Sequence, residues 1–209
     1  MTIAIIGAGQ VGGALGRSLV AQGESVHFGV PNPGKYASLV EELGSLARVG
    51  TVSTAVAAAS EIVILATPYA AATEAARSIP DWGGRILVDA TNPIAPALSG
   101  LSIGTSSSGA EELARLATRA RVVKAFNTTG FENMADPEYP EGRIFMPVCG
   151  DDVDARRKVV ALAILLGFDG VDAGPLAAAR YLEPFAMTWI HLAYRQGFGR
   201  KFAFSIIRR

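Results

Sequence analysis

Residues Ile3–Gly16 read IAIIGAGQVGGALG, and this stretch decides the fold. Its first four residues are all apolar, which is typical of a parallel strand that is buried on both faces. Gly7, Gly9 and Gly12 follow in the G-x-G-x-x-G spacing, which between a strand and a helix indicates dinucleotide binding. The first glycine allows a tight turn, the second lets a pyrophosphate approach the backbone, and the third lets the helix pack on the strand. The alternative is a glycine-rich turn that only joins strand to helix.

The composition excludes several classes of protein. The 209 residues include 19 basic and 19 acidic ones, and this zero net charge gives no reason to expect nucleic acid or an anionic membrane as a partner. The single cysteine, Cys149, cannot form an internal disulfide, and no Cys/His cluster offers metal ligands. The longest apolar run, Val159–Leu166, is far shorter than the ~20 residues that a membrane span needs. We therefore expect a cytoplasmic protein without a metal.

Apolar runs alternate with helical segments along the chain. Strands are expected at residues 3–6, 25–29, 49–52, 62–66, 85–90, 121–126, 143–149 and 168–173. This alternation predicts βαβ units and a parallel sheet. The fold class is therefore a Rossmann-type, doubly wound α/β fold with a mainly parallel sheet over residues 1–174. Residues 175–209 form a C-terminal helical segment that packs on this domain or on a partner subunit.

Prolines and polar residues refine three of these elements. Pro147 lies inside the strand at 143–149 and favours a position towards the edge of the sheet. Residues 131–142 are polar and rich in turn formers, so an exposed loop is expected there. Pro184 lies inside the long C-terminal helix and predicts a kink or a restart.

The residues after the second strand decide which nucleotide is favoured. NAD-binding sites place an Asp or Glu there to accept a hydrogen bond from the ribose 2′-hydroxyl, and this chain instead reads GVPNPGKY at residues 29–36. Without that carboxylate, NADP(H) is favoured over NAD(H), and Asn32 and Lys35 are candidate contacts of the 2′-phosphate. The alternative for Lys35 is a solvated side chain in the first turn of the next helix.

The candidate site lies where the strands end. The segments Gly7–Gly12, Thr67–Tyr69, Thr91–Pro93 and Asn127–Thr129 each follow a predicted strand. Because the carboxyl ends of parallel strands share one edge, a cofactor along it would place its pyrophosphate at the first segment and its nicotinamide towards the last two. No His/carboxylate pair is found there to move an alcohol proton. Hydride transfer between two redox rings, which mainly needs positioning, is therefore favoured.

Three further features each have two interpretations. Ser108 and Glu111 have the spacing of a helix capping box, and the alternative is that Thr105–Gly109 binds a substrate phosphate at that helix start. His191 is either an interior or interface histidine or a catalytic one. The tail, GFGRKFAFSIIRR, could close over a ligand or pack on a partner.

The segment VVKAFNTTG at residues 122–130 carries a resemblance to a known family. With DATNP upstream, and LLGFDGVDAGPL and ARYLEPFAMTWIHLA downstream, the chain resembles the F420-dependent NADP oxidoreductases over essentially its whole length. The Rossmann domain is also similar to the NADPH-binding domain of the STEAP-type metalloreductases. The resemblance implies a homodimer that passes hydride between NADP(H) and a flavin or deazaflavin such as F420. Some deazaflavin-using members have histidine where this chain has Asn127, so FMN, FAD or another acceptor is the alternative.

The resemblance also implies roles for individual residues. It assigns Gly9, Gln10 and Val11 to the pyrophosphate. It assigns Thr67, Pro68, Asn92 and Pro93 to the nicotinamide half of the cofactor, and Ala125, Phe126, Asn127 and Thr128 to the junction of the two rings, where Asn127 and Thr128 would be catalytic. Many family members have Ser-Arg where this chain has Val30 and Pro31, so the arginine that would hold the 2′-phosphate is absent.

Two other functions remain as alternatives. One is an NAD(P)H-dependent reductase of a small imine or keto acid, but such enzymes usually append a substantial helical dimerisation domain and only residues 175–209 are left for one. The other is a non-catalytic regulator that senses NADPH, which would show no turnover with any acceptor.

Overall fold

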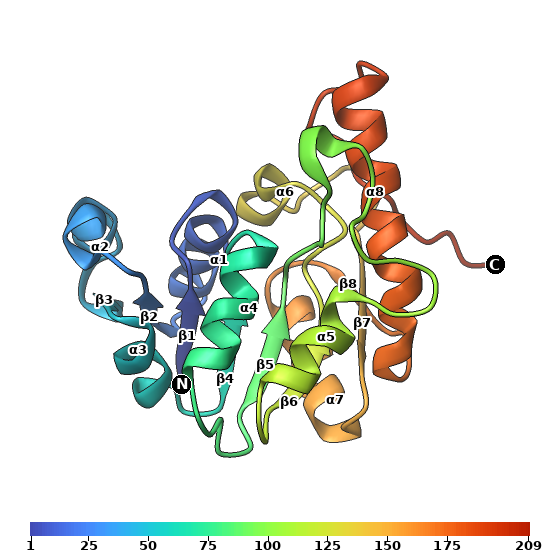
Figure 1. The fold of residues 1–209 in the computed structure, drawn as a ribbon. Coiled ribbons are helices and arrows are strands. Elements are labelled where there is room, and N and C mark those ends of the chain that lie inside the picture. Colours follow the sequence, from blue (N-terminus) through green and yellow to red (C-terminus); the bar gives the residue numbers. More distant parts are fainter.

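The computed structural model describes residues 1–209 and contains one eight-stranded sheet in the order β3-β2-β1-β4-β5-β6-β7-β8 (Figure 1). The strands are β1 (Thr2–Ile6), β2 (Ser25–Gly29), β3 (Ala47–Gly50), β4 (Ile62–Leu65), β5 (Ile86–Asp89), β6 (Arg121–Lys124), β7 (Phe145–Gly150) and β8 (Asp169–Asp172). All neighbours are parallel except β6 and β7, which are antiparallel. The predicted Rossmann-type fold is confirmed, and its strand order reverses between β1 and β4.

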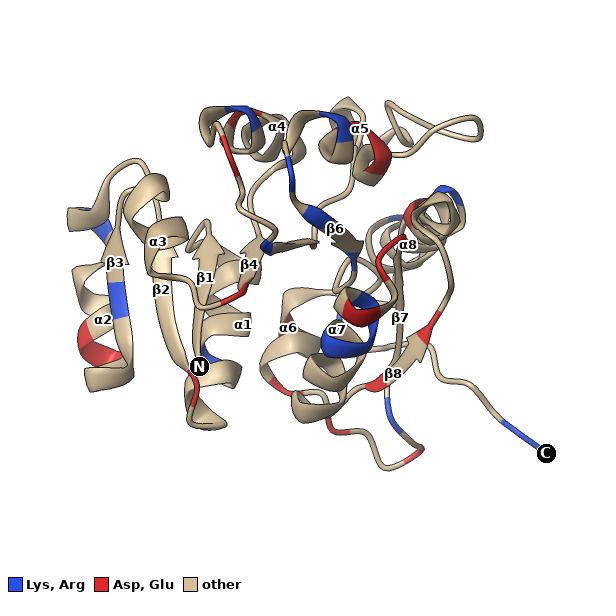
Figure 2. Ribbon diagram, turned by 90° about the horizontal axis from the view of Figure 1, so that it is seen from below, with Lys and Arg blue, Asp and Glu red and all other residues tan.

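Helices cover both faces of the sheet (Figure 2). On one face lie α1 (Gln10–Ala21), α2 (Ala37–Leu43), α6 (Phe131–Ala135) and α7 (Val153–Leu165). On the other lie α3 (Val52–Ala58), α4 (Tyr69–Ser78), α5 (Gly109–Leu116) and α8 (Ala179–Arg195). Short 3-10 turns occupy Pro33–Tyr36, Gly44–Leu46, Pro96–Leu98 and Leu176–Ala178. Acidic and basic residues are spread over both layers, in keeping with the zero net charge.

Strand β1 shows why its sequence has no polar alternation. Ile3 and Ile5 belong to the core under α1 and α7, whereas Ala4 and Ile6 belong to the core under α3 and α4. Each of these four side chains is at most 1% exposed. Because successive side chains of a strand point to opposite faces, a strand covered on both sides must be apolar at every position.

The expectation of an exposed loop at residues 131–142 is wrong at its start, where α6 forms. Asn133 and Met134 are buried there. Met134 joins the core beside α1, and its carbonyl oxygen accepts a hydrogen bond from Ser18 Oγ at 2.8 Å. Tertiary contacts therefore outweigh the weak local helix signal, because packing of an apolar face supplies most of the stability of a short helix.

The expectation that β7 lies towards an edge is also wrong, because β8 forms the edge and β7 lies between it and β6. Pro147 has no N–H to donate. The β6–β7 ladder accordingly pairs only Cys149 and Gly150 of β7, beyond the proline, with Lys124 and Val123. The proline is thus accommodated inside the sheet by a ladder that begins after it.

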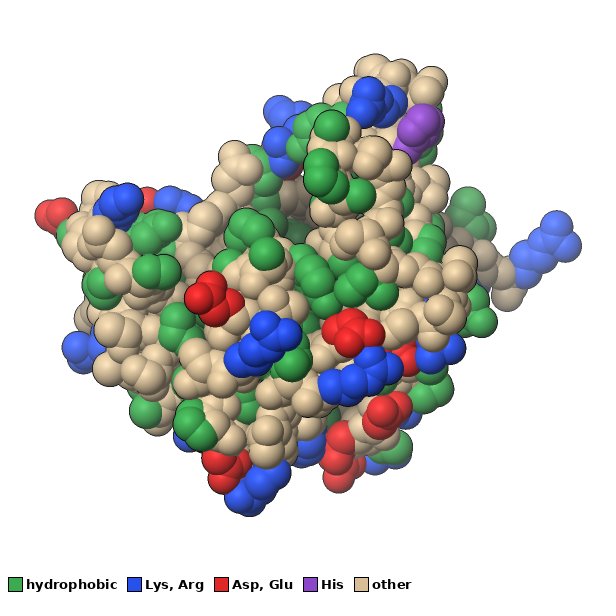
Figure 3. Space-filling view, viewed as in Figure 1, with side chains coloured by type: hydrophobic (Ala, Val, Ile, Leu, Met, Phe, Trp, Pro, Cys, Tyr) green, Lys and Arg blue, Asp and Glu red, His purple; other side chains and the backbone are tan.

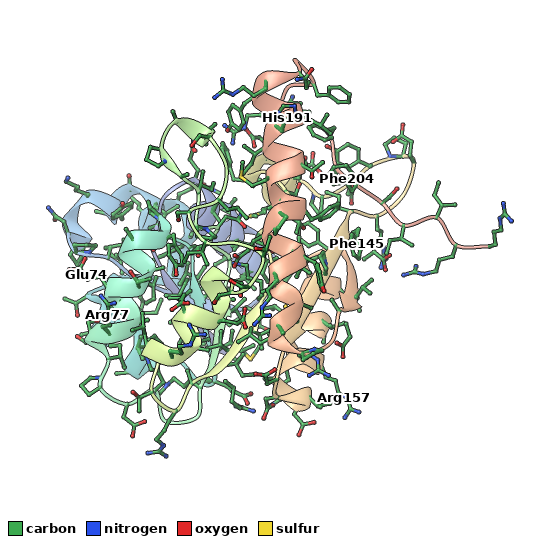
Figure 4. The ribbon with its side chains drawn as sticks, turned by 45° about the vertical axis from the view of Figure 1, so that its right-hand side comes forward. Glu74, Arg77, Phe145, Arg157, His191 and Phe204 are labelled. Atoms are coloured by element: carbon green, nitrogen blue, oxygen red, sulfur yellow. The ribbon has the colours of Figure 1, made fainter.

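The C-terminal segment packs on its own chain. Helix α8 runs through Pro184 without a restart, and Leu182, Ala186, Trp189 and Ala193 of its apolar stripe are buried. The tail then folds back over α8, where Trp189 stacks on Phe202 with ring centroids 5.3 Å apart. Phe145 N donates to Phe204 O at 2.8 Å, and Figure 4 shows these two rings beside α8. No helix is both long and apolar enough to pass through a bilayer.

Candidate functional site

The glycines after β1 have distinct surroundings. Gly7 has φ +99°, and a Cβ there would lie 2.6 Å from Ala66 O. A Cβ on Gly12 would collide with the carbonyl oxygen of Gly7. A Cβ on Gly9, in contrast, would meet nothing within 4 Å. Close packing of the backbone therefore requires glycine at positions 7 and 12, whereas Gly9 leaves open space beside the backbone.

The start of α1 has no side-chain cap, a property that it shares with α2, α4, α6 and α8. The N-cap of α1 is Gly9, and its first turn contains no acidic residue. Helices α3, α5 and α7 are instead capped by the side chains of Thr51, Ser108 and Asp152. Since the first N–H groups of a helix have no partner within it, the start of α1 is suited to an external anion.

Two pockets flank this glycine turn. One, of about 230 Å³, lies across the ends of β1, β2 and β4 and is lined by Ile6, Gly7, Gly29, Pro31, Val52, Thr67, Ala71, Glu74, Ala75 and Ser78. The other, of about 350 Å³, is lined by Gly9, by Lys35 of the turn before α2, and by residues of α1, α2 and α6 that include Gln10 and Arg17. Figure 3 shows a hollow in the upper surface, between the α1 side of the molecule and α8. Gly7 and Thr67 thus line one cavity, and Gly9, Gln10 and Lys35 line the other.

The candidate 2′-phosphate residues are accessible. Asn32 and Lys35 are both exposed, and Lys35 lines the second pocket whereas Asn32 lines neither. Arg17, which our sequence analysis missed, lies in the same pocket and is held by Glu42 through two bonds of 2.7 and 2.8 Å. Arg17 follows Gln10 by two helical turns and so lies on the same face of α1, and this spacing could have identified it from the sequence.

Among the remaining predicted residues, exposure differs between the two ends of the site. Pro68 is exposed, Val11 and Thr67 are half-buried, and Pro93 and Ala125 are buried. These residues lie at the starts of the segments that follow β1, β4, β5 and β6, so the topology brings the four predicted strand ends to one edge of the sheet.

The loops after β5 and β6 are joined by two asparagines. Asn92 Nδ2 donates to Asn127 O at 2.9 Å, and Asn127 Nδ2 donates to Asn92 Oδ1 at 3.0 Å. Asn127 Nδ2 also lies 3.3 Å from Leu182 O of α8. The Asn127 side chain is 3% exposed, and its Oδ1 is buried without a partner. Its amide is therefore held in one orientation by groups from two other elements.

The turn after β6 is strained. Phe126 has φ +60°, a conformation that is a genuine outlier for a bulky side chain. Its ring is fully buried and packs edge-on against Phe168, with centroids 6.0 Å apart. Thr128 is 3% exposed, and its Oγ1 lies 4.0 Å from Met146 Sδ. Backbone strain of this kind persists only where surrounding packing enforces it, and it clusters at functional sites.

The start of α5 is closed by protein groups. Ser108 Oγ accepts from Glu111 N at 3.2 Å and donates to Glu111 Oε2 at 2.8 Å, which confirms that Ser108 caps this helix. Gly109 N and Ala110 N donate to the two carboxylate oxygens of Glu183 at 2.9 and 3.1 Å. The hypothesis that Thr105–Gly109 binds a substrate phosphate is therefore wrong, because a buried carboxylate already occupies that helix start.

Glu183 belongs to a buried ion cluster that our sequence analysis did not find. Lys124 Nζ lies 2.7 Å from Asp89 Oδ2 and 3.0 Å from Glu183 Oε1, and it donates to Thr91 O at 2.6 Å. All three charged side chains are at most 1% exposed. Burial lowers the pKa of Lys124, but the two carboxylates more than offset this, so the net shift is upward and the ammonium stays charged.

His191 is not an interior residue, because its side chain is exposed near the far end of α8 (Figure 4). It shares a hydrogen bond of 3.1 Å with Gln196. Together with Leu98, Met187 and Tyr194 it lines a groove between α8 and the loop after β5. The interior interpretation of His191 is therefore wrong, and the interface and catalytic interpretations remain.

Comparisons with known proteins agree with this geometry. Residues 2–93 match the family model described as NADP oxidoreductase, coenzyme F420-dependent. A structure of protein SMa0349 from Sinorhizobium meliloti is 34% identical, with a TM-score of 0.80, and the alignment covers 88% of this chain and 90% of that one. The chain belongs to the F420-dependent NADP oxidoreductase family.

Two further relatives fit this membership. A provisionally assigned F420-dependent NADP reductase from Arthrobacter sp. FB24 is 29% identical, with a TM-score of 0.83 and 99% of each chain covered. Metalloreductase STEAP3 of Rattus norvegicus is 32% identical over 182 residues, which are 87% of this chain and 35% of STEAP3. The chain thus spans about a third of that curated relative. The family is one of NADP-dependent oxidoreductases, as the sequence analysis predicted.

Proposed function

We propose that this chain transfers hydride between NADP(H) and the ring of a flavin or deazaflavin such as coenzyme F420. The observation that carries the proposal is the open backbone at Gly9, next to an uncapped helix start, in a chain of this family. Open space at Gly9 fits a pyrophosphate, and the free N–H groups of α1 suit its charge. The reduced nicotinamide would supply the hydride.

The contribution of the protein would be to bind and orient. The turn after β1 would hold the diphosphate, with Gln10 and Val11 beside it. Thr67, Pro68, Asn92 and Pro93 would border the nicotinamide half. The turn from Ala125 to Thr128 would lie where the two rings meet, and its strained, packed backbone would keep their separation fixed. Positioning of this kind can lower a barrier substantially without any acid or base.

We also propose that NADP(H) is preferred to NAD(H). Lys35 is an exposed cation in the pocket beside Gly9, and no carboxylate follows β2 to repel a 2′-phosphate. Asn32 would assist from the same loop. This recognition would replace the arginine that many family members have at the position of Pro31.

A homodimer is part of the proposal. Tyr181 and Tyr194 of α8 are 76% and 48% exposed, and contact with a second copy would cover such apolar surface. Sedimentation equilibrium should then give twice the chain mass of 21.8 kDa. If the protein sediments as a monomer at every concentration, the homodimer proposal is refuted, and the proposed redox activity is unaffected.

The activity is tested by following the oxidation of NADPH and of NADH with FMN, FAD, coenzyme F420 and ferric chelates in parallel. We expect turnover with at least one ring acceptor and a higher kcat/KM for NADPH. Turnover only with small imines or keto acids would identify a different reductase. Tight NADPH binding without turnover on any acceptor would indicate a sensor.

A further inference from the structure

The hydride transfer proposed above assigns no role to the buried ion cluster of Asp89, Lys124 and Glu183. Burying charged groups is costly, and apolar side chains of similar volume often give equal or greater stability. The cluster is nevertheless fully formed, with Thr91 bonded to Asp89 through both its N–H and its hydroxyl, at 2.9 and 2.7 Å. Stability alone therefore does not account for it.

The cluster joins the elements that carry the candidate ring junction. Asp89 is the last residue of β5 and Lys124 the last of β6, and each stands three positions before an asparagine of the reciprocal pair. Glu183 reaches both of these strand ends from α8 through Lys124. It also anchors α8 to the start of α5.

Helix α8 touches the asparagine pair directly at the neighbouring residue. Leu182 O accepts from Asn127 Nδ2, and Leu182 is followed by Glu183 in the chain. Two contacts thus hold α8 against β6 and the turn after it: Glu183 with Lys124, and Leu182 O with Asn127 Nδ2. Loss of the Glu183–Lys124 contact should therefore weaken the Leu182–Asn127 contact.

We propose that Glu183 is a positioning residue for hydride transfer, which orients the Asn127 amide by holding α8 against the ends of β5 and β6. The proposal rests on the proposed function and makes the C-terminal helix part of the redox site. Because a misplacement of about 1 Å can cost about 100-fold in rate, even a small shift of α8 should slow the reaction. Binding of the nucleotide should change little, because the cluster makes no hydrogen bond or ion pair with the turn after β1, where the diphosphate would be held.

The variant Glu183→Gln keeps the size of the side chain and one carbonyl acceptor but removes its charge. We expect single-turnover hydride transfer at saturating NADPH to slow at least about tenfold, while the Kd for NADPH stays within about twofold. The matched control is Glu111→Gln. Glu111 also joins α5 to α8, through bonds of 2.9 and 2.6 Å to Arg180, but it touches neither Lys124 nor Asn127. The control should keep the wild-type rate.

A second readout needs no activity. In the free protein, NMR signals of the Asn92 and Asn127 side-chain amides should shift, and their hydrogens should exchange faster with solvent, in Glu183→Gln but not in Glu111→Gln. A purely structural role for Glu183 would lower the Tm of the variant and leave these signals in place. Unchanged amide signals would therefore overturn the proposal whatever the rates.

The outcomes separate this proposal from the one on which it rests. A wild-type protein without turnover on any ring acceptor would refute the proposed function. An active wild type, with Glu183→Gln as fast as Glu111→Gln, would refute only the positioning role. If Glu183→Gln does not fold, Glu183→Asp, which keeps the charge but shortens its reach, takes its place with the same two readouts and the same expected results.

Discussion

Asn92 and Asn127 bond to each other in both directions across the ends of β5 and β6. Each side-chain Nδ2 donates to the other residue, at 2.9 and 3.0 Å, one to a backbone and one to a side-chain oxygen. The two residues come from segments 35 positions apart, so the pair fixes a tertiary relationship and not a local turn. The two loops that would border the nicotinamide are therefore tied to each other by this pair.

Replacing Asn92 should damage the reaction more than it damages binding. Asn92→Ala leaves polar groups of Asn127 without a partner, which should cost about 1–3 kcal/mol of unfolding free energy, measured in urea. Hydride transfer should slow by a larger factor than the Kd for NADPH rises, and Asn127→Ala should follow the same pattern. The control is Ser102→Ala, which removes a hydrogen bond of 3.0 Å to Pro93 O in the same loop. An equal loss of rate in the control would show that the loop, and not the pair, is responsible.

The glycines after β1 should separate binding from folding. Gly9→Ala adds a Cβ into open space, so its Tm should match the wild type while calorimetry shows NADPH affinity weakened at least about tenfold, because the methyl takes the place of the pyrophosphate. Gly12→Ala should instead lose about 1–3 kcal/mol of stability, because its Cβ overlaps the Gly7 carbonyl in a tight helix–strand contact. If Gly9→Ala binds NADPH as the wild type does, the diphosphate does not lie at this turn.

Nucleotide preference should depend on Lys35. An exposed cation that contacts a 2′-phosphate contributes on the order of 1 kcal/mol, so Lys35→Ala should weaken NADPH binding about fivefold and leave NADH binding unchanged. Arg157, which is 74% exposed on α7 at the opposite end of the molecule (Figure 4), provides a control for total charge. Equal effects of Lys35→Ala on both nucleotides would place the 2′-phosphate elsewhere.

The fold could be predicted because its signals are local. The apolar run of β1, the glycine spacing and the return of apolar runs after each helical segment are all read within short windows, and each strand was found near its actual position. The predictions that were wrong concern elements whose structure depends on residues far away in the sequence. Helix α6 depends on Ser18 and on the core beside α1, and the place of β7 depends on β8, so neither could be read from its own segment.

The ion cluster shows the same limit within the candidate site. Asp89, Lys124 and Glu183 are far apart in the sequence, and each alone has the appearance of a solvated charge. A signal was nevertheless present, because Asp89 and Lys124 each end an apolar run that is buried on both faces, in ILVD and RVVK. A charge inside such a run needs a buried partner, although the sequence does not say which residue provides it.

The acid side of the stability profile should depend on His27. Burial lowers its pKa, and the charge of Arg48 lowers it further. The unfolded chain, in which histidine has a pKa of about 6.5, therefore takes up the proton first as the pH falls. His27 carries no penalty above about pH 6.5, and stability is lost as the pH falls from there through the lower pKa of the folded state. Urea unfolding at about pH 7.5 and pH 5 should show a smaller acid loss for His27→Gln than for the wild type. An equal loss of unfolding free energy at about pH 5 in the variant and in the wild type would show that other groups cause the acid response.

Cys149 should be inert until the chain unfolds. Its thiol is fully buried on β7, with Sγ 3.8 Å from Leu176 O, and burial raises its pKa to about 12. At about pH 8 the group is therefore both neutral and inaccessible, and only the thiolate attacks disulfide reagents. An aromatic disulfide reagent should react negligibly with the native protein and should release one equivalent of its chromophore per chain in urea, since the chain has a single cysteine. Cys149→Ala should release none under either condition. Rapid stoichiometric reaction of the native protein would mean that β7 opens locally, and it would contradict the packing of that strand between β6 and β8.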